Sequence, residues 1–258
     1  MNKQDKLSFP RLRRFNLIMG VLHLVQGLLM IMLSNDKTYP IYSTFLRFNT
    51  EKFQLEPKLE LLSELRFGPA VGAFLLISAA AHFYLTTWGY ERYVKNLKLG
   101  INPVRFYEYA FSSSLMIVLI AMLVGVWNVI GLIGLFGLNA LMNFFGIMME
   151  YDNQGRTRTR WNAFIYGSIA GIIPWIAMAV NLYGSAVVND AQPPNFVYAI
   201  LISLFLFFNS FAVNMYLQYK KVGPWKNYLF GERVYIILSL VAKTALAWQI
   251  FAGTLAPV

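Results

Sequence analysis

The chain contains no cysteine and only two histidines, His23 and His82, among its 258 residues. The lack of cysteine excludes disulfide bridges and thiolate metal sites, and it leaves the redox compartment undetermined. Two histidines argue against a multi-histidine metal centre. Charged residues are also scarce, at 13%, whereas hydrophobic residues make up 57%. This composition is typical of a membrane protein, and the length is sufficient for one helical bundle.

The apolar segments are long enough to cross a bilayer, which takes about 20 mostly apolar residues per helix. The sequence predicts an all-α membrane protein in which seven such helices form one domain over residues 1–258. The polar start and the lack of a small-residue cleavage site indicate a retained first helix rather than a signal peptide. The predicted spans are residues 14–33, 67–89, 103–127, 129–150, 161–184, 196–219 and 232–254.

The formal net charge of +10 is compatible with binding either to nucleic acid or to a membrane, so the placement of the basic residues decides. Sixteen lysines and arginines lie on the N-terminal side of the predicted bundle, and five lie on the other side together with five acids. By the positive-inside rule, the N-terminus is cytoplasmic and the C-terminus extracellular in a cell membrane. The basic surface then faces anionic lipid, and no nucleic-acid partner is needed.

The first connection, residues 34–66, is the only long one. Apolar and polar residues alternate over residues 39–55, as in a β-strand pair, and Asn49 and Thr50 suit a turn. We therefore predict a short extracellular β-hairpin, with a disordered loop as the alternative.

Lys243 is the residue least expected in a membrane span. It lies about 11 residues, or roughly 16 Å, from the cytoplasmic end at Glu232 and Arg233. A lysine at this depth costs about 3 kcal/mol, so it needs a buried partner. Glu108, in the third span, is a better partner than Glu150 at the edge of the fourth. The pair is either a structural ion pair or a Schiff-base lysine with its counterion, because a desolvated amine is a competent nucleophile toward an aldehyde.

Other polar residues are predicted at the level of Glu108. His23 and His82 both lie roughly 10–14 Å from the cytoplasmic face. Asn16, His23 and Gln26 fall on one face of the first helix. Each of these residues alone is more often an ordinary helix–helix contact, but their convergence favours a functional site.

Two serines are placed one helical turn from the charged pair. Ser112 follows Glu108 by four residues, and Ser239 precedes Lys243 by four residues. Side chains at this spacing are neighbours on a helix, so each serine is predicted to hydrogen-bond its charged neighbour or a shared water.

Three segments together carry a family resemblance. They are Asn16 with GVLHLVQG (20–27), RFYEY (105–109) and SLVAKTALAW (239–248). With them, the chain resembles the heliorhodopsins, retinal proteins whose membrane topology is inverted relative to other microbial rhodopsins. The predicted orientation and the long first connection agree with that resemblance. It implies all-trans retinal bound covalently to Lys243, with Glu108 as the sole carboxylate counterion and Ser239 near the linkage.

The resemblance also implies a polar cavity on the cytoplasmic side and a homodimer in which the hairpin strands form the interface. Tyr109 is expected near the counterion and Trp248 near the chromophore. The residues implied for the cavity are His23, His82, Asn16, Gln26 and Asn139.

The chain departs from ion-pumping rhodopsins at two positions. Pumps carry an aspartate where this chain has Ser239, and proton pumps carry a donor carboxylate where it has Leu119. We therefore predict a light receptor with a slow photocycle that signals to a cytoplasmic partner without net ion transport.

Two other classes of protein remain as alternatives to the receptor. One is a light-gated or passive proton channel or transporter using Glu108 and Lys243. The other is a lipid-modifying enzyme, against which the lack of a nucleophile motif and of a metal cluster weighs.

Overall fold

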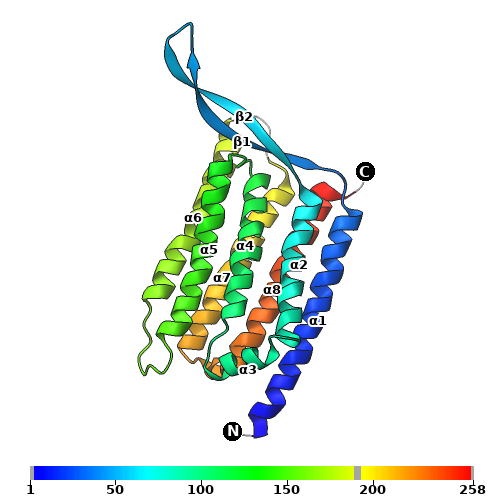
Figure 1. The fold of residues 1–258 in the computed structure, drawn as a ribbon, viewed down its shortest axis with the longest axis vertical. Coiled ribbons are helices and arrows are strands. Elements are labelled where there is room, and N and C mark those ends of the chain that lie inside the picture. The colour runs from blue at the N-terminus through cyan, green and yellow to red at the C-terminus, as the bar shows by residue number, and fades with distance from the viewer. Residues whose placement is uncertain (1–2, 189–192, 257–258) are drawn as a thin grey trace.

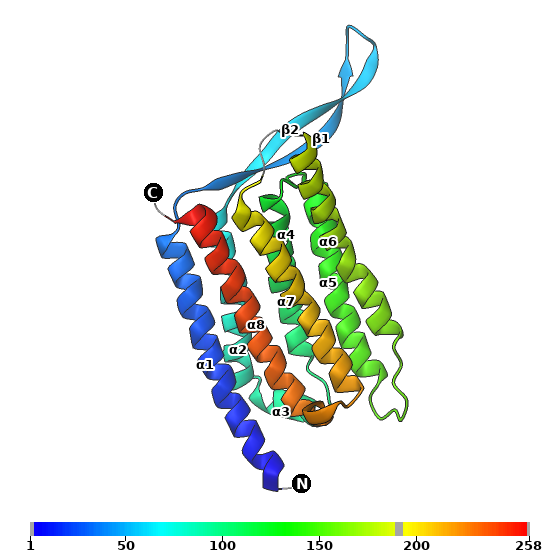
Figure 2. The ribbon, with the colours of Figure 1, turned by 180° about the vertical axis from the view of Figure 1, so that it is seen from behind.

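Seven long helices form a bundle, and a two-stranded hairpin extends from one end of it (Figure 1). The structure is a computed structural model that describes residues 3–188 and 193–256. Helix α1 starts at the end of the bundle opposite the hairpin, here called the N-terminal end, and α8 finishes at the hairpin end (Figure 2). The helices are α1 (Lys3–Leu33), α2 (Phe67–Thr86), α3 (Tyr90–Lys98), α4 (Pro103–Leu123), α5 (Val129–Asp152), α6 (Asn162–Val188), α7 (Asn195–Tyr219) and α8 (Tyr228–Ile250).

The prediction of seven membrane spans is confirmed, because seven of these helices are long and apolar enough to cross a bilayer. Their outer faces carry large apolar side chains that the protein leaves uncovered. On α1, for example, Ile18, Val21, Val25 and Leu28 are all exposed. A contiguous apolar surface of this size is stable in lipid rather than in water. The chain is therefore a multi-pass membrane protein.

Asparagine side chains fix where three of the spans begin. Asn102 accepts a hydrogen bond from the backbone of Arg105 and caps α4, and Asn128 caps α5 directly after the tight connection from α4. Asn227 accepts from the backbone N–H of Leu229, so α8 begins at Tyr228, four residues before the predicted start of the seventh span. The predicted ends of the second and third spans were three and four residues too late.

Helix α3 was missed by the sequence analysis. It is only nine residues long and lies across the N-terminal end of the bundle (Figure 1). Tyr93 and Leu97, one turn apart, are buried, whereas Arg92, Lys95 and Lys98 are exposed. A short amphipathic helix of this kind has no long apolar run, so a search for membrane spans does not find it.

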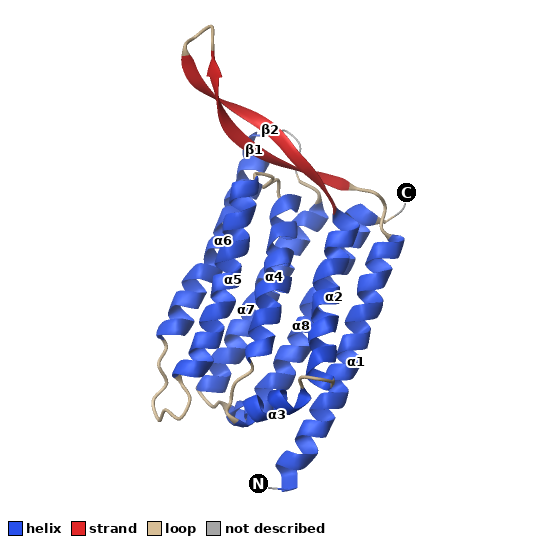
Figure 3. Cartoon of the chain, viewed as in Figure 1, coloured by secondary structure: helices blue, strands red, loops and turns tan. Residues whose placement is uncertain are grey.

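The predicted hairpin is confirmed, and the alternative of a disordered loop is wrong. Strands β1 (Thr38–Asn49) and β2 (Gln54–Arg66) pair antiparallel from Thr38 opposite Arg66 to Asn49 opposite Gln54. Figure 3 shows these strands crossing the hairpin end of the bundle and continuing beyond it. The backbone N–H of Tyr42 donates to Trp127 O at 2.9 Å, which ties β1 to the connection between α4 and α5.

Candidate functional site

Lys243 lies in the middle of α8 with its side chain 3% exposed. Its Nζ donates to Ser239 Oγ at 2.8 Å, one turn earlier on the same helix. It also lies 3.2 Å from Glu108 Oε1 on α4. The structure therefore brings together the lysine, the carboxylate and one of the two serines that the sequence analysis placed at this level. A buried ammonium group depends on such a carboxylate for its charge to be tolerated.

Glu108 is held by a serine that the sequence analysis missed. Ser78 Oγ on α2 donates to Glu108 Oε1 at 2.6 Å. Ser112, predicted to contact Glu108, is fully buried, and its hydroxyl makes no hydrogen bond within the described part of the chain. Ser78 precedes His82 by one turn, which was the available signal.

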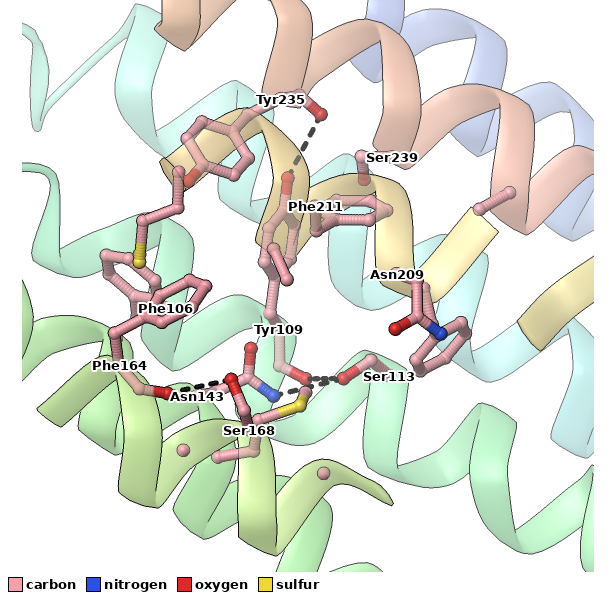
Figure 4. Close-up of a pocket in the computed structure, with 18 of the residues that line it drawn as sticks. Phe106, Tyr109, Ser113, Asn143, Phe164, Ser168, Asn209, Phe211, Tyr235 and Ser239 are labelled. Atoms are coloured by element: carbon pink, nitrogen blue, oxygen red, sulfur yellow. Dashed lines mark hydrogen bonds between the residues drawn. The ribbon is translucent and has the colours of Figure 1, made fainter. Parts of the chain in front are cut away.

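Lys243 lines a large cavity. Its volume is about 360 Å³, and it is lined by residues of α4 to α8. In Figure 4, Tyr109 and Phe211 stand near Ser239, while Asn143 and Ser168 lie farther along the wall. The Tyr109 hydroxyl donates to Tyr235 O at 3.1 Å, and its ring centroid lies 4.9 Å from Lys243 Nζ. The lysine therefore lines a chamber whose walls are mainly apolar and aromatic.

The two histidines lie side by side between α1 and α2. Their rings stack with centroids 5.5 Å apart, and both side chains are buried. His82 Nδ1 lies 2.8 Å from Asn16 Oδ1, whereas neither ring nitrogen of His23 has a hydrogen-bond partner among the described residues. The ring nitrogens of the histidine pair are thus only partly hydrogen-bonded, which is unusual for buried polar groups.

A second, small cavity of about 30 Å³ lies beside His82. Asn16, His82 and Glu108 line one part of it, and Arg105 and Glu232 line another. This volume is enough for about one or two water molecules, and the walls supply several polar groups to hold them. Glu108 and the histidine region therefore share a polar space.

Arg105 forms a second buried charged cluster that the sequence analysis did not find. Its guanidinium lies 2.5 Å from Glu150 Oε1 and also pairs with Glu232 Oε2. Glu150 and Glu232 lay at the predicted edges of their spans, but both are buried because α5 and α8 extend farther than expected. Further donors complete the cluster: Tyr228 and the backbone of Asn102 donate to Glu150, and Tyr93 and the side chain of Asn102 donate to Glu232.

Three other predicted site residues lie around this centre but not within it. Trp248 Nε1 donates to Gln26 Oε1 at 3.2 Å, so these two residues join α8 to α1 on the hairpin side of Lys243. Asn139 on α5 donates to Ser113 and Ser114 on α4 at 2.7 and 3.0 Å. The histidines lie on α1 and α2, and none of the described hydrogen bonds joins Asn139 to them.

Comparison with known proteins identifies the family. A search of curated proteins gave no match. The family model named Heliorhodopsin matches residues 12–255, which include every charged and polar residue of the site. This family comprises retinal-binding, light-sensing rhodopsins, with retinal on a lysine, and is not a known class of enzymes. The chain belongs to the heliorhodopsin family, and it is a photoreceptor of the microbial-rhodopsin type.

Proposed function

We propose that the protein is a light receptor with all-trans retinal linked to Lys243 as a protonated Schiff base and with Glu108 as the sole carboxylate counterion. The position of Lys243 Nζ carries this proposal, because it lines the large cavity and lies 3.2 Å from Glu108. The cavity volume of about 360 Å³ is within the range of ligand pockets, about 300–1,000 Å³. Aromatic side chains such as Trp175, Phe208 and Phe211 line it and fit an apolar polyene.

The residues around the pair have separable roles in this proposal. Retinal, when bound, supplies a chromophore that isomerises in light. Glu108 supplies the negative charge that a buried cationic linkage requires. Ser239 and Ser78 orient the two members of the pair through contacts of 2.8 and 2.6 Å. The ring of Tyr109 forms the adjacent wall.

We expect the proton that leaves the linkage to stay inside the protein. His82 and Glu108 line the small polar cavity, and His23 stacks on His82. Proton pumps carry a donor carboxylate at the position of Leu119, and in this protein that leucine is fully buried in the apolar core. The proton is therefore stored in the polar region and returned, without net transport and with a slow photocycle.

The predicted topology says which end of the receptor faces the cytoplasm and which faces the outside of the cell. The N-terminal end carries sixteen basic residues and faces the cytoplasm, where an unidentified signalling partner would bind. The hairpin faces the outside of the cell membrane. Phe45, Leu46, Phe48 and Leu55 on the hairpin are exposed. These apolar side chains support packing of the hairpin against a second copy in a homodimer.

Flash spectroscopy and pH measurement test this function together. A flash should remove the visible band, and the band should return slowly as the linkage regains its proton. In unbuffered suspensions of illuminated cells the external pH should stay constant. A light-dependent pH shift that a protonophore abolishes would contradict storage without transport.

The small cavity between Glu108 and Glu232 favours one second candidate, a light-gated or passive proton channel. A light-dependent proton current in voltage-clamped cells, missing in Lys243→Ala, would establish the channel in place of the non-transporting receptor.

A further inference from the structure

A chain of hydrogen bonds leads from the histidine pair to the short helix at the N-terminal end. His82 Nδ1 contacts Asn16 Oδ1 at 2.8 Å. Asn16 Nδ2 donates to the Tyr93 hydroxyl at 3.4 Å, and the Tyr93 hydroxyl donates to Glu232 Oε1 at 3.1 Å. All four side chains are buried. These hydrogen bonds therefore join side chains of four helices, α2, α1, α3 and α8.

The direction of donation in this chain is fixed by its members. Asn16 Nδ2 also donates to the backbone oxygen of Leu12 at 3.0 Å, and a carbonyl oxygen only accepts. The amide oxygen of Asn16 must therefore face His82, so His82 Nδ1 carries a hydrogen and donates. Every bond then points from His82 toward the carboxylate of Glu232. The other ring nitrogen, His82 Nε2, is left able to accept a proton.

Tyr93 is the residue through which this series of hydrogen bonds reaches α3. Its side chain and that of Leu97 are the two buried residues of this helix, and they pack with Leu12 and Leu85. Burial, reinforced by the neighbouring Glu232, raises the pKa of Tyr93 well above its usual range. The hydroxyl therefore keeps its hydrogen for donation to Glu232, and α3 is attached to the bundle interior by a polar contact as well as by packing.

We propose that Tyr93 is a positioning residue that couples the protonation state of the His82 region to α3, which makes α3 the element that moves in response to light. The inference rests on the proposed function, because light must first deliver a proton to the polar region. His82 and Glu108 line the same small cavity, so a proton leaving the Lys243–Glu108 pair has a short path to His82. The outward face of α3 carries Arg92, Lys95 and Lys98, and a shift of the helix moves these charges.

The coupling acts through the strength of hydrogen bonds and not by conducting a proton. The amide of Asn16 in the middle of the chain is a poor proton carrier. A doubly protonated His82 is a stronger donor to Asn16, and hydrogen bonds in a chain polarise one another. The bonds from Asn16 to Tyr93 and from Tyr93 to Glu232 therefore strengthen together. Return of the proton weakens them again, so the position of α3 follows the photocycle.

The absence of cysteine from the natural chain permits a direct test. Lys95→Cys places a single thiol on the exposed face of α3, where a nitroxide spin label can be attached without absorbing in the retinal band. The full-length, retinal-loaded protein is reconstituted in lipid, and its paramagnetic resonance spectrum is recorded in the dark and under illumination. We expect a light-induced spectral change that decays with the photocycle. In Tyr93→Phe this change should be lost, while the dark-state visible band stays in place.

Tyr90→Phe is the matched control, because it removes a hydroxyl from the same helix but leaves the ring under the guanidinium of Arg13, 4.4 Å from the ring centroid. It should keep the full light-induced change. Asn16→Leu breaks the chain at a second point and should also abolish the change. In each variant the photocycle, followed at the visible band, should still run, so that loss of the spectral change at the label reports loss of the coupling.

Two results would overturn the coupling while leaving the receptor intact. One is a normal light-induced change at the label in Tyr93→Phe. The other is a label that does not respond to light in the parent Lys95→Cys protein although its visible band and photocycle are normal. A parent protein that forms no visible band with retinal would instead remove the proposed function and the coupling with it.

Discussion

The protein buries two neighbouring charged clusters, and they differ in how many hydrogen bonds their carboxylates receive. In the N-terminal cluster, the carboxylates of Glu150 and Glu232 each receive bonds from Arg105 and from two further donors. In the central pair, Ser78 and Lys243 both contact the same oxygen of Glu108. Both clusters border the small cavity, through Glu108 in one and through Arg105 and Glu232 in the other, but Lys243 of the central pair also lines the large cavity.

This difference separates structural charge from functional charge. A buried ion cluster in which every carboxylate has several donors holds its helices in one arrangement. A sparse pair beside a cavity can instead accept a bound group and let a proton move. Burial and charge alone would have marked both clusters as functional sites, whereas the large cavity distinguishes them, because Lys243 lines it and Arg105, Glu150 and Glu232 do not.

Removal of Arg105 should have the largest effect on folding. Arg105→Met leaves Glu150 and Glu232 buried, close together and without their shared cation. Loss of one partner of a buried ion pair costs about 3–5 kcal/mol, so we expect a poorly folded protein with a strongly lowered unfolding temperature. Arg92→Met on the exposed face of α3 is the control and should unfold like the parent. Equal stability of Arg105→Met and the parent would show that the cluster is not structural.

Neutralisation of Glu108 should have the largest effect on colour. In Glu108→Gln the cationic linkage at Lys243 has no counterion, and a buried unpaired charge loses its proton. We expect the visible band to be replaced by near-ultraviolet absorption at neutral pH, in a protein that still folds. Glu91→Gln, at an exposed position on α3, should keep the parent spectrum. An unchanged visible band in Glu108→Gln would assign the counterion to another group.

Substitution of Ser78 near Glu108 should have a smaller effect than the loss of either charged residue. Ser78→Ala removes a 2.6 Å bond to Glu108, and hydrogen bonds to charged groups contribute about 1.5–3 kcal/mol. We expect a shifted absorption maximum and a lower unfolding temperature. Ser112→Ala is the matched control because the Ser112 hydroxyl has no partner among the described residues, and its removal should change neither quantity. Equal effects of the two substitutions would remove Ser78 from the counterion site.

The histidines should affect the timing of the photocycle and leave the colour almost unchanged. His82→Ala and His23→Ala should both bind retinal, because neither side chain lines the large cavity. His82→Ala should alter the decay of the deprotonated form more, since His82 contacts Asn16 and lines the small cavity. Flash spectroscopy measures these rates. Complete loss of pigment in both variants would place the histidines in the chromophore site itself.

Much of this architecture could be predicted from the sequence because membrane insertion leaves a strong pattern. The seven spans follow from hydropathy, and the hairpin follows from alternation of apolar and polar residues. The pairing of Lys243 with Glu108 could be predicted from depth, because a buried lysine needs a carboxylate and few spans contain one. The contact of Ser239 with Lys243 follows from helical spacing alone.

The remaining parts of the site depend on rotation of helices about their axes and on where helices end. Spacing placed Ser112 next to Glu108, but the carboxylate turns toward Ser78 on α2, and no pattern within one helix predicts that choice. Glu232 was assigned to a helix edge because the cap at Asn227 was not recognised. The cluster around Arg105 was missed for the same reason.

A visible absorption spectrum tests the central claim most directly. The full-length protein and its Lys243→Ala variant are expressed with all-trans retinal, purified in detergent and compared. We predict a red-shifted visible band in the parent that is missing in Lys243→Ala, while free retinal absorbs alike in both samples. Absence of the band from the parent, or its persistence in Lys243→Ala, would contradict the assignment of retinal to Lys243 with Glu108 as its counterion.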